Sequence, residues 1–141
     1  MKVDPRFLKE EGHEVFLGNE LLVKGLLETE GGTHLWTGYP GSPVAGFFDC
    51  IESIQEIPRQ YGIQATMANN EALSVAMLNG SQMSGMRSVA VMKSVGLHVA
   101  ADALALEPAH QGDDDVAIGR DRLEGVVIAA NAGSVNEVLS R

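Results

Sequence analysis

The chain is poor in the residues that disulfides, iron–sulfur clusters and zinc sites require. Its 141 residues include one cysteine, Cys50, which cannot form a disulfide within the chain. Structural zinc sites and iron–sulfur clusters take several ligands, so a single thiol excludes a self-contained site of either kind. Aromatic residues make up only 5% of the chain. We therefore expect a core of aliphatic side chains and methionine.

Basic residues and long apolar runs are also scarce. The chain has 10 lysines and arginines against 19 acidic residues, for a net charge of −9. Phosphate backbones are bound through clusters of lysine and arginine, so this charge argues against a nucleic-acid partner. No apolar run approaches the ~20 residues that span a bilayer, and the N-terminus lacks the apolar centre of a secretory signal. We expect a cytoplasmic protein without a membrane partner.

The residues that are present suit one soluble domain. Hydrophobic residues make up 45% of the chain, and the length is that of a single domain of common size. Residues 1–14 are predicted to be a frayed, charged leader. Residues 15–141 are predicted to form one α/β domain.

Helical periodicity alternates along the chain with short apolar runs typical of buried strands. The expected helices cover 19–28, 43–54, 71–85 and 94–106, and the expected strands cover 33–37, 62–68, 88–93 and 125–131. Ser134 with Glu137 matches a capping box and predicts a last short helix, after a polar acidic loop over 107–121. This alternation predicts a doubly wound, mostly parallel sheet with helices on both of its faces.

Capping residues precede three of these helices. Asn19 and Asn70 are expected to cap the helices that follow them. Ser42 before Pro43 has the pattern of a helix start, with a capping hydroxyl followed by a residue whose missing N–H is not needed there.

Ligands of parallel sheets bind at the carboxyl ends of the strands. Three segments lie at that edge in the predicted sheet, at 38–43, 68–71 and 93–98. The first segment, Gly-Tyr-Pro-Gly-Ser-Pro, has the composition of an ordinary turn, but its helix start also offers N–H groups to an anion. It is not a P-loop, because the Gly-Lys-Ser/Thr ending is missing. Both interpretations of the segment stay open on composition alone.

The polar residues of the other two segments also allow two interpretations. Glu71 either complements the dipole of its helix or holds a carboxylate next to a ligand. Lys93 and His98 are either solvated, or they supply a positive charge and an N–H donor to an anionic substrate. The acidic run 113–115 is interpreted as solvated loop, and we expect no metal site in the chain.

Taken together, three stretches resemble a known family. They are "GNELLVKGLLE", "TGYPGSP" and "NNEALSVAMLNGSQMSGMRSVAVMKSVGLHVAADAL", within residues 16–106. In this order and spacing they are similar to the N-terminal pyrimidine-binding domain of 2-oxoacid:ferredoxin oxidoreductases, with the large (alpha) subunit of indolepyruvate ferredoxin oxidoreductase the most similar branch. The resemblance implies a thiamine-diphosphate pyrimidine-domain fold.

The resemblance also implies a role for each matching residue. Glu71 would be the catalytic carboxylate, hydrogen-bonded to N1′ of the aminopyrimidine so that the 4′-imine can take the proton from C2 of the thiazolium. The implied cofactor-binding residues are Tyr39, Pro40, Gly41, Glu71 and Gly96. The implied substrate-binding residues are Ser42, Lys93, Ser94 and His98, with Ser42 facing the substrate carboxylate. The implied reaction is oxidative decarboxylation of a 2-oxoacid, with indolepyruvate the candidate substrate, to an acyl-CoA with electrons passed to ferredoxin.

The sequence also departs from this family. The diphosphate-binding domain and the cluster cysteines are missing from these 141 residues, and the chain after residue 106 differs. We expect a truncated form, a split subunit or a degenerate relative. In the first two cases magnesium and iron–sulfur clusters would be held by absent domains or by partners, within an oligomer. The alternative is a non-catalytic module that binds a small anion or serves assembly.

Overall fold

The computed structural model describes residues 3–105, 125–131 and 134–136. In chain order its elements are η1 (Pro5–Leu8), α1 (Gly18–Glu28), β1 (Leu35–Gly38), α2 (Ala45–Ser53), α3 (Glu56–Gln60), β2 (Gln64–Ala65), α4 (Glu71–Met83), β3 (Ser88–Lys93), α5 (Gly96–Val99), α6 (Ala101–Ala105), β4 (Gly125–Asn131) and β5 (Ser134–Asn136). No helix within these ranges is long and apolar enough to cross a membrane.

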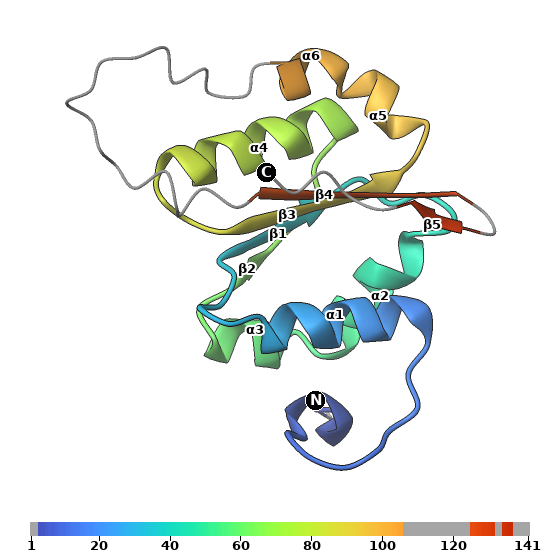
Figure 1. Ribbon diagram of the computed structural model, residues 1–141, viewed down its shortest axis with the longest axis vertical. Helices are drawn as coiled ribbons and strands as arrows, with labels where there is room; N and C mark the ends of the chain where they lie inside the picture. The colour runs from blue at the N-terminus through green and yellow to red at the C-terminus, as the bar shows by residue number, and fades with distance from the viewer. Residues whose placement is uncertain (1–2, 106–124, 132–133, 137–141) are drawn as a thin grey trace.

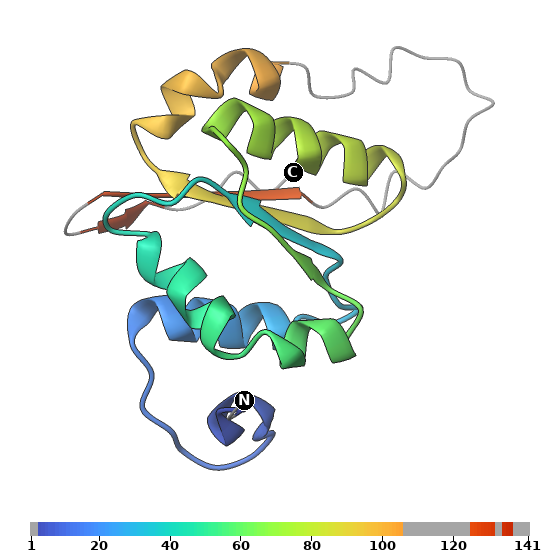
Figure 2. The same ribbon diagram turned by 180° about the vertical axis from the view of Figure 1, so that it is seen from behind.

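The strands form one mostly parallel sheet with helices on both faces. The strand order is β2-β1-β3-β4-β5, and every pair is parallel except β4 with β5. Helices α1, α2 and α3 cover one face, while α4, α5 and α6 cover the other (Figures 1 and 2). The predicted α/β, doubly wound architecture is therefore confirmed.

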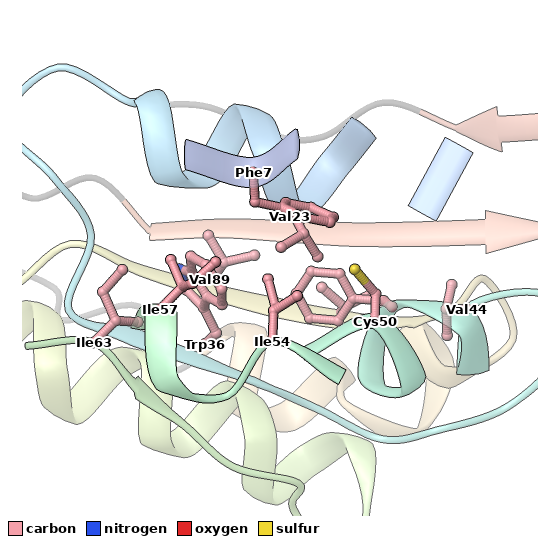
Figure 3. Packing of buried hydrophobic residues seen from close by; sticks show 11 residues of the cluster. Phe7, Val23, Trp36, Val44, Cys50, Ile54, Ile57, Ile63 and Val89 are labelled. Carbon is pink, nitrogen blue, oxygen red and sulfur yellow. The ribbon is translucent and has the colours of Figure 1, made fainter. Parts of the chain in front are cut away.

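The apolar run of β3 contributes side chains to the hydrophobic clusters on both faces of the sheet. Its residues are buried as far as Met92, and successive side chains point to opposite faces. Val89 and Val91 belong to the cluster that includes Trp36 and Phe47, under α1 to α3 (Figure 3). Ala90 and Met92 belong to the second cluster, under α4 and α6. The near-continuous hydrophobicity of β3 is therefore what a central strand buried on both faces requires.

Two helix starts differ from the prediction, and a third agrees with it. The Asn70 side chain accepts a hydrogen bond from the Leu73 N–H at 2.7 Å, so its predicted cap of α4 is confirmed. Asn19 does not cap α1, because that helix begins at Gly18. Ser42 does not cap α2 either, because α2 begins at Ala45 without a side-chain cap.

The predicted helix after Ser134 is wrong. Ser134–Asn136 form β5, in which Val135 lies opposite Ala130 of β4 in antiparallel register. Pairing with β4 gives the backbone N–H and C=O groups of this segment hydrogen-bond partners. A local capping motif cannot predict this pairing, because the partner strand lies outside the motif. Glu137 and the predicted loop over 107–121 lie outside the described residues.

The N-terminal segment is charged as predicted, and η1 with the residues beside it contacts the rest of the domain. Phe7 is only 4% exposed and joins the core cluster under α1, with its ring 5.3 Å from that of Phe16 in an edge-on arrangement. The buried Lys24 ammonium donates to the carbonyls of Phe7 at 3.1 Å and Lys9 at 2.7 Å. This part of the segment therefore packs on α1 as part of the domain.

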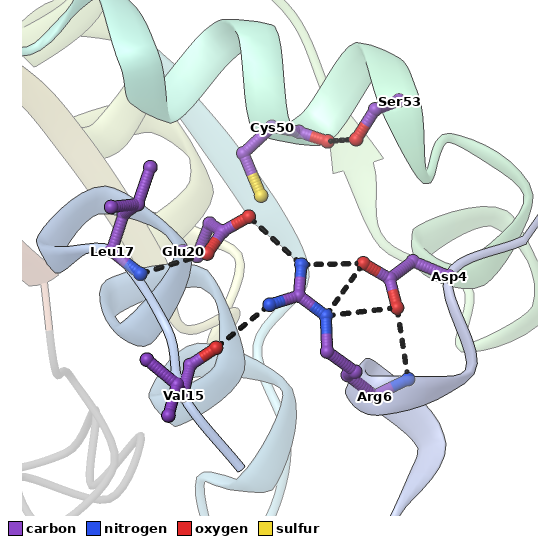
Figure 4. Close-up of polar contacts among 7 residues, drawn as sticks. All are labelled: Asp4, Arg6, Val15, Leu17, Glu20, Cys50 and Ser53. Atoms are coloured by element: carbon purple, nitrogen blue, oxygen red, sulfur yellow. Dashed lines mark hydrogen bonds and ion pairs between the residues drawn. The ribbon is translucent and has the colours of Figure 1, made fainter.

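Arg6 holds the same segment against the start of α1. Its guanidinium forms ion pairs with Asp4 at 2.7 Å and Glu20 at 3.0 Å, and it donates to the Val15 carbonyl (Figure 4). The hydrogen bonds from Arg6 lower the pKa of the Asp4 carboxyl. The hydrogen bond from the Leu17 N–H lowers the pKa of the Glu20 carboxyl, and the hydrogen bond from Arg6 lowers it further. Both carboxylates therefore favour the folded state in their ionised form.

Replacing Phe7 by alanine tests whether this segment belongs to the domain. We expect Phe7→Ala to lower the free energy of unfolding by about 3–5 kcal/mol, because a fully packed ring leaves a cavity. Leu8→Ala is the matched control, since Leu8 is 45% exposed and a change there falls within about 0.5 kcal/mol. Urea unfolding followed by fluorescence measures both, and equal stability of the two variants would contradict the packing of Phe7.

The Arg6 cluster also predicts a dependence of stability on pH. The pKa values of Asp4 and Glu20 are lower in the folded chain, so their contribution is present above the unfolded pKa values and is lost as pH falls through the folded ones. We expect Arg6→Gln to destabilise the chain at neutral pH and to have less effect under acid conditions. Arg59→Gln, at an exposed ion pair, is the control. Thermal unfolding from neutral to acid pH tests this, and a parallel loss for Arg6→Gln and the unmodified chain would contradict it.

Candidate functional site

The end of β1 brings two loops to the carboxyl edge of the sheet. Gly38 has φ +148°, and a Cβ at this position would lie 2.0 Å from the Val91 carbonyl oxygen, so only glycine fits. The Tyr39 N–H donates to the same Val91 carbonyl at 3.1 Å, and the Ala68 N–H donates to the Gly38 carbonyl at 2.9 Å. The turn after β1 and the loop after β2 are therefore fixed at one point.

The turn of residues 39–43 leaves β1 and leads into α2. The Gly41 carbonyl accepts the N–H groups of Val44 at 2.7 Å and Ala45 at 3.1 Å, and the Ser42–Pro43 peptide bond is cis. The Ser42 residue is exposed, and its hydroxyl makes no hydrogen bond to any residue that the structure describes. Because it is not a cap, this hydroxyl is available to a ligand.

Glu71 is buried at the start of α4, only 7% exposed. Its side chain packs on Gly96: a Cβ on Gly96 would lie 2.6 Å from Glu71 Cγ and 2.7 Å from Oε1. Within the described part of the chain the carboxylate has no hydrogen bond or ion pair, and no buried side-chain oxygen is left without a partner. The carboxylate oxygens therefore keep contact with the surface while the stem of the side chain is enclosed.

Lys93 brings a positive charge to the turn. Its Cδ atom lies 3.4 Å from the position that a Cβ on Gly41 would occupy, so its aliphatic stem runs beside the turn. Lys93 is exposed at the end of β3, and its ammonium has no ion pair with a described residue. The turn therefore has a cation beside it that can attract an anionic ligand.

The remaining predicted site residues lie at the same edge but are less closely connected. Tyr39 and Pro40 are exposed in the turn, and Ser94 is half-buried between β3 and α5. His98 is exposed on α5, and no hydrogen bond joins it to another predicted site residue in the described part of the chain. The structure thus pairs Glu71 with Gly96 and Gly41 with Lys93.

Asn19 is a residue of this region that the sequence interpretation assigned elsewhere. Its side-chain amide donates to the Pro43 carbonyl at 3.3 Å, from α1 to the end of the turn. The only signal in the sequence was the cap preference of asparagine, which pointed to α1 itself.

Two other kinds of chemistry find little support in the described residues. Burial raises the pKa of the Cys50 thiol to about 11, with further contributions from the Glu20 and Asp4 carboxylates, so the thiol is protonated at neutral pH (Figure 4). Within the described ranges, no group of three or more histidine, cysteine, aspartate or glutamate side chains could hold a metal ion.

Comparison with known proteins finds relatives of one kind. The chain is similar to indolepyruvate oxidoreductase subunit IorA of Archaeoglobus fulgidus, with 33% identity over 96 residues, 67% of this chain and 15% of the relative. The same subunit of Methanothermobacter thermautotrophicus is 32% identical over 94 residues, 66% of this chain and 14% of the relative. That of Pyrococcus horikoshii is 29% identical over 89 residues, 63% of this chain and 13% of the relative. No family model matches the chain.

Among solved structures, the chain is similar to a 2-oxoglutarate:ferredoxin oxidoreductase from Magnetococcus marinus with 2-oxoglutarate, coenzyme A and succinyl-CoA bound. The TM-score is 0.49 at 23% identity, covering 60% of this chain and 14% of that one.

The chain spans about a seventh of the length of these curated relatives. Their shared name agrees with the family that residues 16–106 resemble. The resemblance is confirmed: over about two thirds of its length, this chain is a relative of indolepyruvate oxidoreductase subunit IorA.

Proposed function

We propose that this chain supplies the pyrimidine-binding half of a thiamine-diphosphate site in a 2-oxoacid:ferredoxin oxidoreductase. The observation that carries the proposal is the Glu71 carboxylate, buried in its stem and without a partner among the described residues. Its oxygens reach the surface at the carboxyl edge of the sheet and are engaged by no described residue, so they can accept a hydrogen bond from a ligand. The relatives named indolepyruvate oxidoreductase support the reaction class.

The residues around Glu71 suit an aminopyrimidine better than a metal ion. Glu71 is a single acidic residue at the start of α4, and its side chain lies against the backbone of Gly96. One carboxylate can accept one strong hydrogen bond from a protonated ring nitrogen. When bound, thiamine diphosphate supplies the carbon nucleophile that adds to the ketone of the substrate and accepts the electrons left by departing carbon dioxide.

Glu71 has two functions in this proposal. It accepts the hydrogen bond from N1′ of the pyrimidine, and it holds that proton so that the amino group at 4′ can act as a base. The Glu71 side chain lies in the first turn of α4, at the positive end of the helix dipole. Gly96 lets the side chain approach the backbone, and Tyr39, Pro40 and Gly41 border the ring from the turn.

The substrate carboxylate is proposed to bind between the turn and the end of β3. Lys93 supplies charge, and Ser42 supplies a hydroxyl that no residue in the described ranges engages. Ser94 and His98 extend this border along α5. Which 2-oxoacid fits, indolepyruvate or another, depends on side chains that face these residues.

The site requires a partner on its open side. The chain corresponds to a seventh of its relatives, and it carries one cysteine. We propose that a diphosphate-binding domain or subunit covers the edge of the sheet and binds the diphosphate with magnesium. Clusters held by that partner would pass electrons to ferredoxin, and the assembly would be a cytoplasmic oligomer.

Glu71→Gln tests the central claim. The amide keeps the shape of the side chain but loses the charge that retains the proton. We expect 2-oxoacid-dependent dye reduction by the complex to fall by about 100-fold or more. The assay uses the chain combined with the subunit that carries the diphosphate-binding domain, in the presence of thiamine diphosphate and magnesium.

Glu56→Gln is the matched control, because Glu56 is also in the first turn of its helix but is half-buried and paired with Arg59. Equal activity of both variants would mean that Glu71 only stabilises the start of α4 through the helix dipole, without a role in catalysis. If calorimetry detects no binding of thiamine diphosphate in any mixture, the non-catalytic module becomes the better description.

Gly96→Ala tests the contact that holds Glu71. The added methyl group would lie 2.6 Å from Glu71 Cγ and 2.7 Å from Oε1, so the side chain has to move away. We expect the affinity of the complex for thiamine diphosphate to fall by about tenfold, the value of one charged hydrogen bond. Calorimetric titration with magnesium present measures this change.

Gly25→Ala is the control for Gly96→Ala, since nothing lies within 4 Å of a Cβ at Gly25 in α1. It should bind like the unmodified complex and unfold at an equal or higher temperature, because alanine favours helix. Unchanged affinity in Gly96→Ala would show that the packing of Glu71 on Gly96 does not contribute to cofactor binding.

A further inference from the structure

We propose that Asn19 is a positioning residue, which holds the turn of residues 39–43 from α1 at the carboxyl edge of the sheet. That the turn borders the substrate rests on the function proposed above. That Asn19 holds the turn in place does not depend on that function. The carrying observation is the hydrogen bond from Asn19 Nδ2 to the Pro43 carbonyl at 3.3 Å.

The side chain of Asn19 is not needed by its own helix. The first turn of α1 is closed by the Leu17 N–H, which donates to Glu20 Oε2 at 2.8 Å, and by the Leu17 carbonyl, which accepts from Leu21. Asn19 is half-buried and is directed towards α2. Its amide therefore serves the contact between the two helices.

Gly46 leaves the space that this amide occupies. A Cβ on Gly46 would lie 2.7 Å from Asn19 Nδ2 and 3.4 Å from its Cγ. Glycine in the first turn of a helix is otherwise unfavourable, because it loses more conformational freedom on folding than other residues. Its presence in α2 is explained by the approach of Asn19, which any larger residue would displace.

The turn is thereby held at both of its ends. At Tyr39 the backbone N–H donates to the Val91 carbonyl of β3, and at Pro43 the carbonyl accepts from Asn19 of α1. Gly41 and Ser42 lie between the two anchors, with the stem of Lys93 beside Gly41. A hydroxyl that binds a substrate has to be held in place, and here the anchors do so without using the hydroxyl.

Asn19→Asp removes the N–H donor at nearly constant size. We expect the amide hydrogens of Val44 and Ala45, which donate to Gly41, to exchange about fivefold faster, the effect of one net hydrogen bond. Asn79→Asp is the matched control, because Asn79 Nδ2 donates to the Ala103 carbonyl at 2.8 Å on the other face of the sheet. It should leave exchange at the turn unchanged.

Gly46→Ala provides an independent variant. It should accelerate the same amides, but it should have no further effect in an Asn19→Ala background, where the amide is already gone. This non-additivity separates displacement of Asn19 from a general effect on α2. Additive effects, or unchanged exchange in Asn19→Asp, would overturn the proposal.

In the complete complex, Asn19→Asp should raise the KM for the 2-oxoacid by about fivefold with little change in kcat, since a displaced Ser42 weakens ground-state and transition-state binding alike. Asn79→Asp should change neither constant. Faster turn exchange with an unchanged KM would mean that the turn is held but does not border the substrate, which contradicts its proposed use. Absence of thiamine diphosphate binding in the unmodified complex would contradict the proposed function and leave the exchange result standing.

Discussion

The close approach of Gly38 to β3 is the constraint on which the site depends. The backbone of β1 reaches Val91 so closely that no Cβ fits, and the next N–H group donates to the same carbonyl. The Gly38 carbonyl in turn fixes the loop that leads to Glu71, through Ala68. Two loops that are far apart in the sequence are therefore held at one point, which a bulkier residue at position 38 would separate.

Much of this arrangement follows from local patterns in the sequence. The apolar run of β3, the cap of α4 by Asn70 and the alternation of elements all predicted what the structure contains, because each depends on neighbouring residues. Position at the edge of the sheet then follows from topology alone. The juxtaposition of Glu71 with Gly96 does not follow from local patterns, and it was anticipated only through resemblance to a family.

Three of the errors share a physical cause, since each involves a partner that is distant along the chain. Asn19 bonds to Pro43 in place of its own helix, and Phe7 packs into a core built mainly from later residues. Ser134 pairs with β4 although a local motif favours a helix start. Ser42 fails as a cap because α2 begins three residues later, at Ala45. At Asn19 and Ser134 the tertiary partner outweighs a capping preference worth about 1 kcal/mol.

Helix α1 connects these distant contacts. Adjacent residues on a helix point about 100° apart, so Glu20 can engage Arg6 of the N-terminal segment while Asn19 engages the turn. One turn further on, Lys24 binds the carbonyls of Phe7 and Lys9. The segment expected to be a loose leader is thus bonded to the helix that holds the turn. Helix α1 therefore contacts the N-terminal segment through Glu20 and Lys24, and the end of the turn through Asn19.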